Sequence, residues 1–307
     1  MATSGTYYLD GPSLASATAV YTDAALTTKA SDGFYSNGTI VREQSSGLLL
    51  PQNACPSCGI ACGSLVNPPT GGQGLYQLQF EAGSTASDVG AIVIYFNPQS
   101  VPDGIRVLYD SVYYNALASP TDGYRKSSSG VADAFTILGA PSNTCIPTLP
   151  DTSSYTFYDG FTGSSWDVGS PSPQNITINS GDDVRGGTSE YSTLVIPKTA
   201  ATPSTVTVQV LGPCSGTAWN IEVACPTALD SFQGKSIAGT DCDTADTTYY
   251  FAVNRGGTNT YPIVNNWVFS DENGQNVLAD GNYYMDNSTV ITVANGVVTA
   301  VVACTTP

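Results

Sequence analysis

A stretch near the start of the sequence, Thr6–Cys55, recurs at its end as Thr248–Cys304. Five landmarks follow one another in the same order in both copies: a tyrosine pair, a Val-aromatic-x-Asp segment, an Asp-Gly turn, a glycine and a cysteine. In the first copy they are Tyr7-Tyr8, Val20–Asp23, Asp32-Gly33, Gly47 and Cys55, and in the second Tyr249-Tyr250, Val268–Asp271, Asp280-Gly281, Gly296 and Cys304. The two aspartates stand nine residues apart in both copies, and the glycine precedes the cysteine by eight. Such a repeat predicts one architectural unit used twice, and by itself it indicates no chemistry.

The charge of the chain limits its partners. Among 307 residues there are 9 Lys and Arg against 25 Asp and Glu, a net charge of −16, with no histidine. A field of that sign repels nucleic-acid backbones and anionic membrane surfaces, so we expect neither as a partner. No apolar run approaches the ~18 residues that a membrane span needs. Charged residues make up only 11% of the chain, a proportion typical of β-rich extracellular or particle-forming proteins.

Between the copies, the chain shows short strand patterns separated by turn signals. Thr205–Leu211 alternates polar and apolar residues, Ala91–Phe96 is apolar throughout, and Asn37-Gly38 predicts a hairpin turn. We therefore expect an all-β protein, with a central jelly-roll or β-sandwich domain flanked by two homologous small β-modules. The predicted divisions are a first module at 1–55, a Cys/Pro/Gly connector at 56–73, the sandwich at 74–225, an acidic connector at 226–247 and the second module at 248–307.

The cysteines are even in number, which favours disulfides. All eight are candidates: Cys55, Cys58, Cys62, Cys145, Cys214, Cys225, Cys242 and Cys304. The alternatives are free thiols and a zinc site at Cys55–Cys62, and for zinc both histidine and a second Cys-x-x-Cys are lacking. Cys242 and Cys304 bracket the second copy, and a bridge between them would clamp it. Met1–Gly5 has no signal-peptide pattern, which leaves a processed secreted protein or a cytosolic product that later meets oxidising surroundings.

Candidates for chemistry are few. Without histidine, Ser-His-Asp and Cys-His arrangements are impossible. The carboxylate pairs Asp182-Asp183 and Asp159 with Asp167 are better explained as solvated turn residues. Asp241, Asp243 and Asp246 could hold calcium, with an exposed acidic linker as the alternative. We therefore predict a protein that is not an enzyme and that holds no cofactor or metal.

Tyrosine doublets are the remaining feature. On a strand, one ring of each pair faces outward, where it could join a subunit interface or a sugar-binding face. The interface candidates are Tyr7, Tyr8, Tyr249, Tyr250, Tyr283 and Tyr284, which all lie inside the repeats. For a sugar-binding face, the tryptophans Trp166, Trp219 and Trp267 are candidates by residue type.

Three stretches carry a resemblance to a known group of proteins. Tyr7–Leu9, Val20–Thr28 and Asp32–Ser36 resemble a module of structural proteins from environmental tailed bacteriophages. The central runs Gly90–Pro98 and Val101–Arg106 are similar to sequences of the same kind. The resemblance implies a virion protein of the tail or neck appendage or head-decoration type, extracellular after host lysis, whose partners are other virion proteins and copies of itself.

The resemblance brings no catalytic residues. The alternative function is an extracellular carbohydrate-binding, or receptor-binding, β-sandwich protein, with a host surface glycan as its partner.

Overall fold

A computed structural model describes residues 6–36, 40–50, 53–54, 59–67, 72–127, 131–139, 151–161, 166–178 and 190–306. The regular structure of these residues is β-strand, so the all-β prediction is confirmed. The chain forms two compact units, Met1–Ile60 and Ala61–Pro307. The first holds the N-terminal module, and the second holds both the sandwich and the C-terminal module.

The N-terminal module contains two small sheets. Its strands are β1 (Tyr8–Leu9), β2 (Val20–Tyr21), β3 (Gly33–Ser36), β4 (Ile40–Ser45), β5 (Leu48–Leu49) and β6 (Asn53–Ala54). β1 pairs with β2, while β4 pairs with β3 on one side and with β5 and β6. The predicted β3–β4 hairpin pairing is present, whereas its Asn37-Gly38 turn lies outside the described residues. The core is small: Leu14, Ala17, Val20, Ala30 and Leu49.

Two long polar side chains complete this core. Arg42 is buried and donates hydrogen bonds to the carbonyl oxygens of Leu14, Ala17 and Leu49, among others. Gln44 is also buried, and its amide bonds to the backbone of Val20 and Ala30. Since a module this size buries few aliphatic groups, these bonds connect loops that the core alone would hold weakly.

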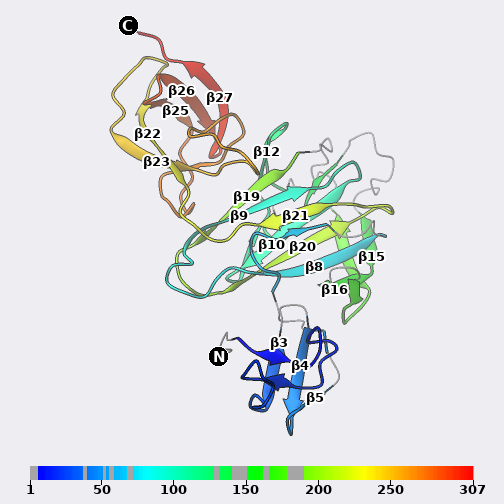
Figure 1. The fold of residues 1–307 in the computed structure, drawn as a ribbon. Coiled ribbons are helices and arrows are strands. Elements are labelled where there is room, and N and C mark those ends of the chain that lie inside the picture. Colours follow the sequence, from blue (N-terminus) through cyan, green and yellow to red (C-terminus); the bar gives the residue numbers. More distant parts are fainter. Residues whose placement is uncertain are drawn as a thin grey trace. The chain divides into compact units, whose positions relative to one another are not determined.

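The sandwich is built from two large sheets (Figure 1). One has the order β11-β10-β20-β8-β16-β17 with β14 on β10, and the other β13-β12-β19-β9-β21-β7. The strands are β7 (Leu65–Val66), β8 (Gly74–Glu81), β9 (Gly90–Asn97), β10 (Asp103–Tyr109), β11 (Val112–Tyr114), β12 (Leu117–Ser119), β13 (Gly123–Arg125), β14 (Thr136–Leu138), β16 (Phe157–Phe161), β17 (Trp166–Val168), β19 (Ser192–Lys198), β20 (Thr205–Gly212) and β21 (Asn220–Val223); β15 (Asp151–Tyr155) and β18 (Gln174–Ile178) pair separately. The sandwich prediction is thereby confirmed, but this strand order does not establish a jelly roll.

The C-terminal module is one sheet of order β24-β23-β22-β25-β26-β27. Its strands are β22 (Asp230–Ile237), β23 (Thr247–Phe251), β24 (Val268–Phe269), β25 (Gly281–Met285), β26 (Thr289–Ala294) and β27 (Val297–Ala303). Its own core includes Phe232, Phe251, Met285 and Ile291.

This module docks on the sandwich through a second core. Ala91 and Val93 of β9 pack there against Trp267, Phe269 and Val297 of the module. The alternate β9 residues are fully buried on the other face, which explains why the whole strand is apolar.

Both predicted connectors contain strands and need correction. β7 lies within 56–73 and pairs with β21, and β22 lies within 226–247 at the centre of the C-terminal sheet. β7 is two residues long, and β22 is mostly polar with a central glycine. Neither gives a local signal, because each is a strand only through its neighbours.

The two modules share the same turns. In each, the first aspartate accepts hydrogen bonds from backbone N–H groups four and five residues later. The donors are Thr27 and Thr28 to Asp23, and Gln275 and Asn276 to Asp271. The second aspartate accepts from the β-turn that follows: Ser46 and Gly47 donate to Asp32, and Asn295 donates to Asp280. Residues with positive φ coincide as well, namely Leu26, Ser46 and Gly47 in the first module and Gly274, Asn295 and Gly296 in the second. The repeat in the sequence is thus a repeat in the fold.

Candidate functional site

A pocket of about 410 Å³ lies where the C-terminal module meets the sandwich. Aromatic side chains from both parts line it: Tyr113, Tyr114, Tyr124, Trp267 and Phe269. Exposed polar side chains stand around them, namely Lys126, Gln275 and Asn295. The pocket thus combines ring faces with groups able to donate and accept hydrogen bonds.

The aromatic wall is fixed by packing and by one strong anchor. The indole N–H of Trp267 donates to the carbonyl oxygen of Thr193 at 2.9 Å, which ties the module to β19. The Tyr124 ring meets the indole edge-on at 5.3 Å, and Phe269 stacks against it at 6.2 Å. Because these rings are held from several sides, they form a preformed surface.

The hydroxyls of Tyr114 and Tyr124 remain protonated at neutral pH. Burial, with the charge of Asp110 adding to it, raises the pKa of Tyr114. Burial also raises the pKa of Tyr124. An apolar wall with phenol and amide groups at its rim fits a polyhydroxylated ligand, whose C–H face covers a ring while its hydroxyls bond at the edge.

The tyrosine doublets do not behave alike. Tyr7 and Tyr8 are exposed, by 43% and 37%. Tyr249 packs on the C-terminal module's own core, and Tyr250 packs on the core shared with the sandwich. The expectation of one outward ring fails at Tyr283 and Tyr284, which are only 6% and 8% exposed, so both faces of the sheet are covered at this point of β25. Of the six candidate interface rings, Tyr7 and Tyr8 are therefore the ones available at a surface.

The tryptophans are also divided. Trp219 is 1% exposed and belongs to the sandwich core, so it offers no sugar-stacking face. Trp166 lies on β17 against Tyr76 and Trp219. Trp267 lines the pocket described above, although most of its ring is buried.

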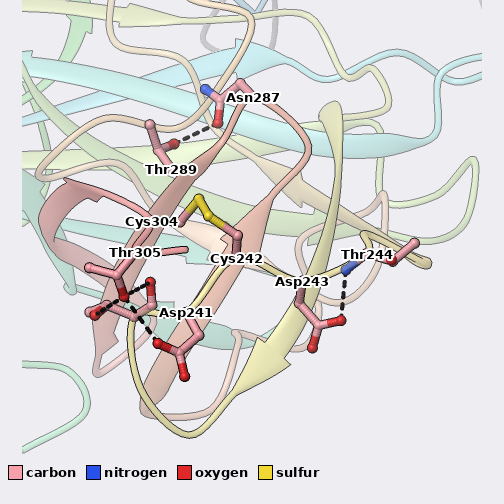
Figure 2. Close-up of a disulfide and its surroundings, with 9 residues drawn as sticks. Asp241, Cys242, Asp243, Thr244, Asn287, Thr289, Cys304 and Thr305 are labelled. Carbon is pink, nitrogen blue, oxygen red and sulfur yellow. Dashed lines mark hydrogen bonds between the residues drawn. A yellow bond between two sulfur atoms is a disulfide. The ribbon is translucent and has the colours of Figure 1, made fainter. Parts of the chain in front are cut away.

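Two disulfides are present among the described residues. Cys242 bonds to Cys304, as predicted for a clamp on the second copy (Figure 2). Cys62 bonds to Cys225. Cys214 is disulfide-bonded too. Because the sulfur of Cys62 is bonded to Cys225, it is not a thiolate ligand for zinc. The remaining candidates, Cys55, Cys58 and Cys145, lie outside the described residues.

Each acidic residue around the Cys242–Cys304 disulfide has a protein partner, and Figure 2 draws Thr305 at Asp241 and the Thr244 backbone N–H at Asp243. Asp241 accepts a hydrogen bond from the Thr305 hydroxyl at 3.0 Å, and Asp243 pairs with Lys235 at 3.0 Å. Asp246 accepts from the Thr247 hydroxyl at 2.9 Å. Within the described ranges, no group of three or more Cys, Asp or Glu side chains is placed to hold a metal ion.

The other carboxylate candidates are two pairs of aspartates. Asp182-Asp183 lies outside the described residues, and Asp159 is exposed on β16 beside the β17 strand that carries Asp167. One buried carboxylate was missed by sequence reasoning. Asp103 is fully buried and accepts a hydrogen bond from the Thr217 hydroxyl, and its burial raises its pKa well above the usual range.

No helix in the described part of the chain is long and apolar enough to cross a membrane. Comparison with protein-family models, with curated proteins and with solved structures finds no match for this chain.

Proposed function

We propose that the protein is a non-enzymatic structural component of a tailed bacteriophage particle. There it assembles with other virion proteins and with copies of itself, as part of a tail or neck appendage or a capsid decoration. The resemblance of its modules to phage structural proteins supports the setting, and the duplicated module supports the assembly role.

The observation that carries the proposal is that one face of the module is a docking face. In the C-terminal module, Tyr250, Phe269 and Val297 lie on this face and pack against the sandwich. By strand register, Tyr8 corresponds to Tyr250 and Tyr21 to Phe269, because Tyr8 pairs with Tyr21 as Tyr250 pairs with Phe269.

In the N-terminal module the corresponding face is open. Tyr8 is exposed, Tyr21 is partly exposed, and Leu48, which follows the β-turn as Val297 does, is 55% exposed. We call Tyr8, Tyr21 and Leu48 the docking face of the N-terminal module. An apolar and aromatic surface of this composition is typical of an interface core.

The test is the native mass of the purified protein by multi-angle light scattering, with and without reductant, together with mass spectrometry of purified phage particles. We expect a discrete oligomer that survives reduction and the presence of the chain in the particles. A strict monomer that is absent from particles would contradict the proposal.

A second candidate function is carbohydrate binding, as in a receptor-binding appendage, and the aromatic pocket favours it. We expect Tyr113→Ala to lower the affinity for a bound glycan at least tenfold, because the substitution removes one ring of the wall without touching the Trp267 anchor. Tyr7→Ser, far along the chain from the pocket residues, is the control. Glycan-array screening supplies the ligand, and equal affinity in both variants would contradict this function.

A further inference from the structure

We propose that the N-terminal module holds an open strand slot between β1 and β3, and that this slot receives an extended strand from a different protein chain. The inference rests on the proposed function, because it names the kind of partner that an assembly module takes. It is argued from the C-terminal module, where the same slot is filled.

In the C-terminal module, β22 lies between β23 and β25 and is antiparallel to both. Its carbonyl groups alternate between these neighbours. That of Gln233 accepts from Asp286, which follows β25, and that of Gly234 accepts from Asp246, which precedes β23. β22 therefore joins two halves of the module that are otherwise separate.

In the N-terminal module, β1 corresponds to β23 and β3 to β25. β1 pairs with β2, β3 pairs with β4, and among the described residues neither pairs with another strand.

A pair of tyrosine rings makes the same contact across the slot in both modules. Tyr249 and Tyr283 project from the two strands that flank β22, and their rings meet at 5.3 Å with planes at 81°. Tyr7, which directly precedes β1, and Tyr35 of β3 hold the corresponding positions, and their rings meet at 5.2 Å and 78°. The same cross-slot contact in both modules is what a similar separation of the flanking strands would produce.

The filled slot shows what the incoming strand requires. Gly234 lies beside the Tyr249 ring, where an added Cβ would come within 2.8 Å of the Tyr284 carbonyl oxygen and 3.1 Å of that ring. Two residues earlier, Phe232 covers Tyr249 and Phe251 with ring separations of 5.7 and 6.1 Å. The strand therefore needs a large apolar residue, one intervening residue, and then a glycine.

The N-terminal slot lacks that cover. Tyr7 is 43% exposed, whereas the corresponding Tyr249 packs against a closed core. Leu9, which corresponds to Phe251, is only partly buried. An aromatic side chain placed between Tyr7 and Leu9 would bury both, and backbone bonds to two strand edges would add affinity, as in strand addition to a sheet.

A second copy of this chain is a poor donor. Its β22 is bonded on both edges and is followed by Cys242, whose disulfide with Cys304 holds the connector. If a second copy donated its β22, the same slot would open in its own C-terminal module. The pairings formed in one chain would then equal those broken in the other. The occupant is accordingly a strand of another protein.

The experiment uses the full chain and a fluorescein-labelled peptide of residues 228–239, which carries the β22 sequence, with fluorescence anisotropy as the readout. We expect saturable binding of one peptide per chain. Phe232→Ser in the peptide should weaken binding at least tenfold, because it removes the side chain that covers Tyr7.

Variants of the chain locate the binding. Tyr7→Ser should weaken binding at least tenfold, whereas Tyr8→Ser, on the opposite face of β1, should leave it unchanged. Binding that is absent, or that is insensitive to Tyr7→Ser because the peptide exchanges into the C-terminal module, overturns the proposal. If the chain self-associates and the peptide dissociates it, the slot receives a strand from a second copy. That outcome would overturn the assignment to another protein. Presence of the chain in particles is measured independently, so loss of the slot leaves the proposed function standing.

Discussion

Asp103 begins β10 with its carboxyl group buried beside the Thr217 hydroxyl. Its second oxygen has no hydrogen-bond partner among the described residues. Burial disfavours the charged form, which is why its pKa is raised well above that of an exposed aspartate. The neutral acid is the form that the fold accommodates.

The consequence is a defined dependence of stability on pH. The folded-state pKa of Asp103 lies above its unfolded value of ~3.9. The buried neutral carboxyl therefore contributes stability that is fully present below the unfolded pKa and is lost as the pH rises through the folded pKa. We expect Asp103→Asn to be more stable than the native protein at pH 8, with the difference disappearing toward pH 4. Urea unfolding across this range measures it, with the exposed Asp159→Asn as control. A difference that does not vary with pH would contradict the assignment.

Arg42 shows how the two modules diverge at single residues. It lies on β4, which corresponds to β26 in the C-terminal module, where the buried core positions are the aliphatic Ile291 and Val293. In the N-terminal module, Arg42 and Gln44 bond to backbone carbonyls instead. With less apolar surface to bury, this module depends more on satisfied polar groups.

At the scale of elements, the disulfide between Cys242 and Cys304 closes a segment of 62 residues that contains strands β23 to β27. A cross-link of this kind restricts the unfolded chain, and removal of a native one costs about 2–5 kcal/mol. We expect Cys242→Ser with Cys304→Ser to lower the unfolding free energy of the second unit by about that amount.

Thermal unfolding of the double variant, with the native protein in reductant as a comparison, measures this effect. Because reductant also opens Cys62–Cys225, the reduced native protein should be less stable than the double variant in oxidising buffer. An unchanged melting temperature in the double variant would contradict a clamping role.

β22 is the element that distinguishes the two modules. It is polar along much of its length and occupies a central place in its sheet only because β23 and β25 offer edges on both sides. The N-terminal module presents the equivalent edges without such a strand among its described residues.

At the scale of the molecule, the same face of the module is buried in one copy and exposed in the other. In the second unit it is buried against the sandwich and creates the aromatic pocket, and in the N-terminal module it carries Tyr8, Tyr21 and Leu48 at the surface. We expect Leu48→Asp to weaken association of the chain in light scattering at least tenfold, because a charge would be desolvated in the interface. Val168→Asp, at an exposed apolar residue of β17, is the matched control. Equal effects of the two substitutions on association would show that the docking face takes no part in assembly.

The sequence by itself determined the strand class and the duplicated module. These follow from local spacing: Asp23 and Asp271 fix the same turn because each reaches backbone N–H groups only four and five residues away. Only the tertiary structure decided that β22 is a central strand, that Tyr283 and Tyr284 are buried, and that Trp267 lines a pocket while Trp219 does not. Each of these depends on which distant surfaces come together, and burial of a polar strand or of both rings of a doublet leaves no periodic signature in the chain.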